Sequence, residues 1–177
     1  MPNCQDHRHG VLLPALEPLE ARLLLTAQPI ISEFLASNVT GIQDYQGDHS
    51  DWIEICNPSS QGLDLTGWKL KDSGSTWAFP AMTLGPGEFR IVFASDKGKA
   101  GYTPAPPAGE LHTSFKLSAA GEYLGLLDPG GNVVQEFDPF PAQNDDMSYG
   151  VGQNIDEVKL VSAGATSGAM LARSRSP

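Results

Sequence analysis

The chain is short of positive charge and has no long apolar run. Lysine and arginine together account for 11 of the 177 residues, against 21 aspartates and glutamates, which gives a formal charge of −10. Scattered basic residues cannot follow a phosphate backbone, so the sequence argues against nucleic acid and anionic membrane as partners. No apolar stretch reaches the ~20 residues that a membrane-spanning helix needs, so no membrane span is expected.

Cysteine is also scarce, with one residue at position 4 and one at position 56. Cys4 lies in a polar leader and Cys56 in an expected strand, and their spacing implies no particular bridge. Whether the two cysteines pair stays open, so cysteine usage does not define the redox compartment.

The residue clusters that catalysis requires are missing. No nucleophile elbow or phosphate-cradling loop occurs, and the histidines lack the paired spacing of a zinc site: His7, His9, His49 and His112. Asp72-Ser73-Gly74 matches the aspartic-protease triplet, but that chemistry needs a second triplet and a turn is favoured. Asp72, like Asp96 and Asp128, falls in an expected turn, where solvent would screen its charge. The chain is predicted not to be an enzyme, with no catalytic residue, cofactor site or cofactor.

One acidic loop leaves a metal site as an alternative. Asp44, Asp48 and Asp51 lie within residues 44–51, which include a glycine. Hard oxygen ligands on a flexible loop suit Ca²⁺, but the spacing departs from that of an EF-hand and no glutamate closes the site. A solvated acidic loop with no metal ligand is the favoured interpretation, and Ca²⁺ binding is the alternative.

Residues 1–28 differ in texture from the rest of the chain. The residues up to Gly10 are polar, and acidic residues and an arginine interrupt the leucine-rich run that follows. We expect residues 1–28 to be a leader or sorting segment that is unstructured or forms a short helix. Residues 29–152 are expected to form the folded domain, and residues 153–177 a linker or disordered tail.

From Pro29 onward, apolar residues recur with the period of two that is typical of half-buried β-strands. About eight short apolar runs are separated by turn sequences, and the chain holds 19 glycines and 14 prolines. This pattern predicts an all-β, antiparallel β-sandwich. The residues expected to be largely buried are Ile53, Ile55, Leu65, Trp68, Leu70, Phe89, Ile91 and Leu126.

The phase of this alternation changes near Gly67. Leu63 and Leu65 occupy odd positions, whereas Trp68 and Leu70 occupy even ones. A bulge or tight bend at Gly67 is expected to place both pairs on the same face.

In other segments the alternation assigns faces directly. Phe89, Ile91 and Phe93 are expected to point inward from residues 88–93. Residues 98–110, with three prolines, are expected to form a long exposed loop, and residues 128–132 a hairpin turn. Binding would then fall to residues 44–51, to residues 97–110 or to an edge strand.

Seven segments together resemble one known family. They are IISEFLASN (30–38), DWIEICNP (51–58), LDLTGWKLKD (63–72), LGPG (84–87), FKL (115–117), GEYLGL (121–126) and SYG (148–150). In this order they are similar to the strands and turns of the lamin tail domain. The resemblance implies an immunoglobulin-like β-sandwich over roughly residues 29–152, and it implies a fold and not a reaction.

The leader carries a second resemblance. Residues 16–27, LEPLEARLLLTA, resemble the Leu-Glu-Pro-Arg-x-Leu-Leu segment of large exported planctomycete-type bacterial proteins, with Leu19-Glu20-Ala21 inserted. Bacterial lamin tail domains look like accessory modules on large exported proteins. The resemblances together imply an extracellular or cell-envelope location.

These observations lead to one functional hypothesis and one alternative. The chain is predicted to be a non-catalytic interaction module that binds a protein or a cell-surface polymer. The alternative is a structural spacer, or an N-terminal accessory fragment of a larger secreted enzyme.

Overall fold

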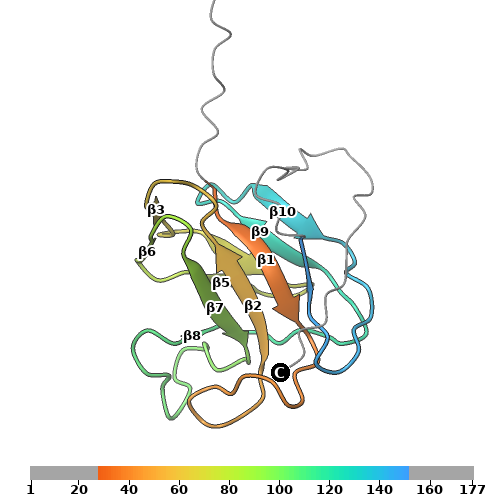
Figure 1. The fold of residues 1–177 in the computed structure, drawn as a ribbon. Helices are drawn as coiled ribbons and strands as arrows, with labels where there is room; N and C mark the ends of the chain where they lie inside the picture. Colours follow the sequence, from red (N-terminus) through yellow and green to blue (C-terminus); the bar gives the residue numbers. More distant parts are fainter. Residues whose placement is uncertain (1–27, 152–177) are drawn as a thin grey trace, which may run out of the picture.

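The computed structural model describes residues 28–151. Within this range it consists of β-strands, turns and loops (Figure 1). One sheet has the order β11-β1-β2-β7-β8 and contains β1 (Ile30–Leu35), β2 (Asp51–Cys56), β7 (Phe89–Ala94), β8 (Leu111–His112) and β11 (Tyr149–Gly150). The second sheet has the order β10-β9-β4-β5 and contains β4 (Lys69–Lys71), β5 (Thr76–Ala78), β9 (Leu124–Leu127) and β10 (Val133–Phe137). Two short strands, β3 (Leu63–Asp64) and β6 (Thr83–Leu84), pair separately.

The hydrophobic core lies between the two larger sheets. Ile53 and Ile55 enter it from β2, Leu70 from β4 and Leu126 from β9, and each of these side chains is fully buried. Burial of one such side chain stabilises the fold by about 1.5–3 kcal/mol, so these strands account for much of the stability. The predicted all-β sandwich is confirmed, and all paired strands are antiparallel except β7 and β8.

The predicted change of phase at Gly67 is also confirmed. Gly67 has a φ of 82°, in the left-handed region that favours glycine. The N–H of Trp68 donates to the carbonyl of Leu65 at 3.0 Å, which closes a turn. Leu65 and Trp68 therefore both face the core, although they lie in different phases of the sequence.

The face assigned to β7 is wrong. Ile53 of β2 lies opposite Val92, and side chains directly opposite in a sheet share a face. Val92 is therefore the core residue, while Phe89 is 44% exposed and Ile91 is half-buried. Phe93 is buried as expected, but on the outer side, where it stacks on His112.

Three other expectations differ from the structure or lie outside it. The described range has more strands than the eight expected, because several are only two residues long. Residues 115–117 form no strand, and contribute an isolated bridge between Ser95 and Lys116. Residues 1–27 of the leader and the whole of the expected tail fall outside the described residues, so the boundaries at 28 and 152 stay predictions. No helix among residues 28–151 has the length and apolarity to cross a membrane.

Candidate functional site

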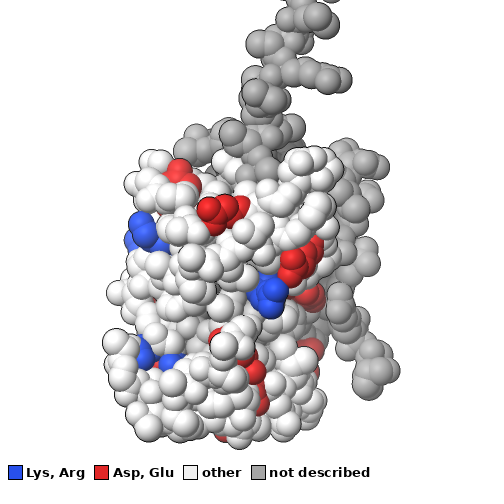
Figure 2. Space-filling model, turned by 90° about the vertical axis from the view of Figure 1, so that its left-hand side faces the viewer, with Lys and Arg blue, Asp and Glu red and all other residues white. Residues whose placement is uncertain are grey.

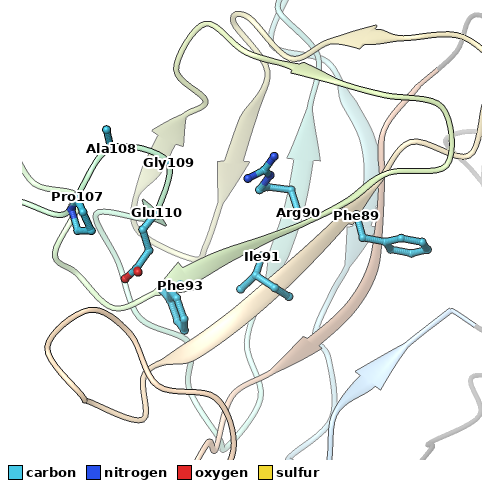
Figure 3. Close-up of a pocket in the computed structure, with 8 residues that line it drawn as sticks. All are labelled: Phe89, Arg90, Ile91, Phe93, Pro107, Ala108, Gly109 and Glu110. Carbon is cyan, nitrogen blue, oxygen red and sulfur yellow. The ribbon is translucent and has the colours of Figure 1, made fainter.

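An open groove lies beside the first half of β7, between that strand and the turn at residues 107–110 (Figure 3). Its volume is about 450 Å³. The groove is lined by Phe89, Arg90, Ile91, Phe93, Pro107, Ala108, Gly109 and Glu110. β8 pairs with β7 only at Val92 and Phe93. Before β8 the chain turns away from β7, and the N–H of Glu110 donates to the carbonyl of Pro107 in this turn. The groove is the space that this separation leaves beside β7.

The outer face of the five-stranded sheet beside this groove carries four apolar side chains around one carboxylate, Glu54, which lies opposite Ile91. The register places Cys56 of β2 opposite Phe89, and Trp52 opposite Phe93. Trp52 and Ile91 are half-buried and Phe89 is exposed, so the surface reaches solvent. We name the side chains of Trp52, Cys56, Phe89 and Ile91 the outer patch. An exposed apolar patch beside a groove is typical of a binding surface.

Arg90 points to the opposite side of β7 from its neighbours Phe89 and Ile91 (Figure 3). Its Nη2 donates to Oε1 of Glu88 at 2.8 Å, while its buried Nε has no partner among the described residues. The pKa of Glu88 is lowered by a hydrogen bond from the backbone of Gly85 and then by Arg90. Glu88 is therefore charged at neutral pH and offsets the positive charge of Arg90.

Glu110 fixes the opposite wall of the groove. Its Oε1 accepts the N–H of Tyr45 at 2.8 Å and lies 2.9 Å from Nε2 of His112. The hydroxyl of Tyr45 donates to the carbonyl of Pro104 at 2.5 Å. The loop at residues 44–51 therefore holds the turn at residues 107–110 in place.

A buried ion pair anchors that loop. Nζ of Lys97 lies 2.5 Å from Oδ2 of Asp44 and 2.7 Å from Oδ2 of Asp48. The Lys97 and Asp44 side chains are 6% and 0% exposed. Burial alone would raise the pKa of Asp44, but hydrogen bonds from Lys97, Ser50 and two backbone amides lower it overall. Burial likewise would lower the pKa of Lys97, and the two aspartates raise it overall.

Comparison with protein families identifies this sandwich. The family model of the lamin tail domain matches residues 26–140, more than half of the chain. The chain belongs to the lamin tail domain family. The match spans β1 to β10 and includes both walls of the groove. No curated protein matches the chain.

Lamin tail domains are non-catalytic immunoglobulin-like modules, so membership accounts for the fold without implying a reaction. This lamin tail domain nevertheless holds a hydroxyl–imidazole–carboxylate chain, in which Oγ of Ser95 lies 2.7 Å from Nδ1 of His112. A carboxylate only accepts hydrogen bonds, so Nε2 of His112 donates to Glu110, while Nδ1 shares a hydrogen bond with the hydroxyl of Ser95. Ser95 is 5% exposed and the His112 side chain is 0% exposed. Substrate has no route to the hydroxyl, and the chain of hydrogen bonds instead ties β7 to β8.

The Asp72-Ser73-Gly74 triplet forms the turn between β4 and β5, as predicted. Oδ1 of Asp72 accepts the backbone N–H of Gly74 at 2.8 Å and also that of Ser75. The expectation that solvent screens this carboxylate is wrong, because Asp72 is 8% exposed. Its hydrogen-bonding capacity is used by the turn.

The loop at residues 44–51 is not the solvated acidic loop that the sequence favoured. Asp44 and Asp48 converge on the ammonium group of Lys97, whereas Asp51 is held by the backbone amides of Asn38 and Leu117. Among residues 28–151, no three histidine, cysteine, aspartate or glutamate side chains are grouped to hold a metal ion. In the structure, lysine supplies the positive charge that the Ca²⁺ alternative assigned to a metal.

Cys56 is buried in the outer patch and forms no disulfide with another described residue. Burial, and then the nearby charge of Glu54, raise the pKa of its thiol, which keeps the thiol protonated and unreactive. Cys4 lies outside the described residues, so the question of a bridge stays open.

Sequence reasoning missed both contacts that build the groove wall. Lys97 pairs with a residue 53 positions away, and Glu110 with one 65 positions away. No local spacing signals contacts at such separations. The sequence did indicate residues 44–51 and 97–110 as functional loops, and the structure brings these two loops together.

Replacing Lys97 tests the buried pair. Lys97→Met leaves Asp44 as an unpaired buried charge, and we expect the free energy of unfolding to fall by about 3–5 kcal/mol. Lys99→Met is the matched control, because the pair of Lys99 with Asp96 is largely exposed and is worth less than about 1 kcal/mol. Urea unfolding of the three chains measures both losses. Equal, small losses would show that the loop does not depend on the pair.

The pKa of Asp51, at the start of β2, is raised, whereas that of Asp44 is lowered. Burial raises its pKa to about 6, and hydrogen bonds from the backbone of Asn38 and Leu117 and the charge of Lys116 offset only part of this effect. The folded chain therefore binds a proton at Asp51 between about pH 4 and 6, where the unfolded chain does not. The contribution of Asp51 to stability is present below pH 4 and is lost as the pH rises to 6.

This difference predicts an unusual pH profile. Stability should rise by roughly 1–2 kcal/mol as the pH falls from 7 to about 4.5, with allowance for solvent screening of a half-buried group. Below that range stability should fall, because carboxylates with lowered pKa values, such as Asp128 and Asp146, become protonated. Urea unfolding from pH 3 to 7 measures the profile, with Asp51→Asn as the control that lacks the rise between pH 7 and 4.5. Parallel profiles for the two chains would contradict the assignment to Asp51.

Proposed function

We propose that this lamin tail domain is an exported, non-catalytic module that binds a protein partner through the outer patch. One observation carries the proposal: the outer face of the five-stranded sheet presents Phe89, Ile91 and Trp52 to solvent beside an open groove. Aromatic and aliphatic side chains in such a setting are the usual anchors of protein interfaces.

The charge of the chain supports a protein partner over nucleic acid. Acids outnumber bases, and the side of the molecule that carries β8 shows only scattered charged groups on a largely uncharged surface (Figure 2). A continuous basic stripe, which phosphate binding needs, is absent from that view. A cell-surface polymer that stacks on the aromatic side chains is the second candidate.

The proposed location rests on the leader. Residues 16–27 resemble the N-terminal segment of exported bacterial proteins, and the partner would then be a secreted or envelope protein. A structural spacer, or an accessory part of a larger secreted enzyme, is the competing function. A spacer needs no exposed apolar patch, and the outer patch favours binding for that reason.

Affinity capture with the full chain tests this function. The immobilised chain should retain a protein from the secreted or envelope fraction of the source organism, and Phe89→Glu should abolish retention because it places a charge in the outer patch. Val133→Glu is the matched control, since Val133 is 50% exposed but lies on β10 in the other sheet. Titration of the purified partner against the unchanged chain and both variants then gives the affinity of each for the partner.

Three results would count against the proposal. Retention of the same proteins by both variants would exclude the outer patch. Retention of nothing would favour the spacer, and retention of proteins only from a cytosolic fraction tested in parallel would contradict the proposed location.

A further inference from the structure

On the side of β1 that faces away from β2, backbone groups along the strand have hydrogen-bond partners. The side-chain amide of Gln135 pairs with the backbone N–H and carbonyl of Ile31 at 2.7 and 3.0 Å. β11 pairs with Glu33 and Phe34, and Oε1 of Gln143 accepts the N–H of Ala36 at 2.7 Å. Unpaired strand edges invite pairing with other chains, and these side chains and β11 block this one.

The second edge, at β7, is blocked only in its later half. β8 covers Val92 and Phe93, and the bridge to Lys116 covers Ser95. Among the described residues nothing pairs with residues 89–91 on this side. Among the described residues, the sheet therefore has hydrogen-bond partners along β1 but none beside residues 89–91 of β7, next to the groove.

Two hydrogen bonds determine which backbone groups face that opening. The carbonyl of Phe93 accepts the N–H of Thr113, on the β8 side, and the carbonyl of Glu88 accepts the N–H of Asn57, on the β2 side. Backbone groups alternate between the two sides of a strand. The N–H and carbonyl groups of Phe89 and Ile91 therefore point into the groove edge, as two donors and two acceptors with no strand partner among residues 28–151.

The surroundings of these groups fit an extended peptide. An added strand would place alternate side chains against the outer patch, next to Phe89 and Ile91, and its other side chains toward Arg90. The groove separates the turn at residues 107–110 from β7. Hydrogen bonds of Glu110 with Tyr45 and His112 hold this turn in place. A rigid wall reduces the ordering that a peptide must bring about on binding.

Charge restricts the peptide further. Glu88 neutralises Arg90 at 2.8 Å, so the groove has no free cation among its lining residues. Glu110 borders the groove, Glu54 lies opposite Ile91 and between Trp52 and Cys56 on β2, and the chain as a whole carries −10. Lysine or arginine in the peptide would meet a negative potential, whereas acidic residues would be repelled.

We propose that the groove binds an extended, basic segment of a protein partner, which adds as a strand to β7 at residues 89–91. This inference rests on the proposed function and names the form of the partner. β8 ends the opening after three residues, so the added strand is short. Such an interface is small and belongs to the weak, transient class.

The test titrates the full ¹⁵N-labelled chain with a short capped peptide of alternating valine and lysine, followed by NMR. The amide signals of Phe89, Ile91 and Glu110 should shift and saturate. The same peptide with N-methyl groups on alternate residues cannot donate along one edge and should bind about tenfold more weakly, since each main-chain hydrogen bond is worth ~1 kcal/mol. A peptide of alternating valine and glutamate should also bind at least about tenfold more weakly.

Two chain variants provide a matched pair that leaves β7 unchanged. Ala108→Arg fills the groove and repels the lysines, and should weaken binding of the valine–lysine peptide at least about tenfold. Ala105→Arg adds the same charge to the same loop outside the groove lining, and should change the affinity by less than about twofold.

Several outcomes would overturn the inference. These are the absence of a saturable shift up to millimolar peptide, shifts centred away from β7, or equal affinity of the N-methylated peptide. A shift of the β7 amides with chain concentration alone would identify a second copy as the occupant. A change in those amides on ending the chain at Val151 would identify its own later residues. If the peptide fails while Phe89→Glu still abolishes partner capture, only this inference falls and the proposed function stands.

Discussion

The pairing of β2 with β7 along six residues is the constraint on which the rest of the structure depends. Burial of Ile53 and Ile55 in the core is the strongest demand on β2, and the register places Val92 on the same face. Alternation then turns Phe89 and Ile91 outward, whatever their hydrophobicity. The position of the outer patch therefore follows from which side chains fill the core. Its apolar side chains are not needed in the core and are available for binding.

The buried polar side chains have a different role: they join the loops at residues 44–51 and 97–110 into one wall of the groove. Lys97 holds Asp44, the loop that contains Asp44 holds Glu110, and Glu110 fixes the turn beside the groove. A buried pair of charges contributes little net stability compared with apolar packing, but its loss is costly. The pair thus defines where the loop lies and, through the contact of that loop with Glu110, the shape of the groove.

The sequence predicted the fold well because its signals there are local. The bend at Gly67 and the hairpin at residues 128–132 follow from turn chemistry within a few residues. The face of β7 could not be read in the same way, because Phe89, Ile91, Val92 and Phe93 place apolar groups on both faces. Only the register with β2 decides between them, and register is a long-range property.

The candidate site was predictable in outline and not in detail. Residues 44–51, residues 97–110 and an edge strand were the expected binding elements, and the groove lies where β7 meets the second of these loops. The contacts of Asp44 and Glu110 join residues more than 50 positions apart, so their roles required the fold. The sequence favours a solvated Asp44 because acidic side chains are usually exposed, whereas Asp44 is buried against Lys97.

Hydrogen exchange at single residues of β7 tests most directly whether this strand is open along one edge. We expect the amides of Phe89 and Ile91 to exchange at least about tenfold faster than those of Arg90 and Val92, which face β2. An alternating pattern of this kind requires one free edge and the register described here. Uniform slow exchange from Phe89 to Val92 would show that the edge is already covered, and would contradict an open edge at β7.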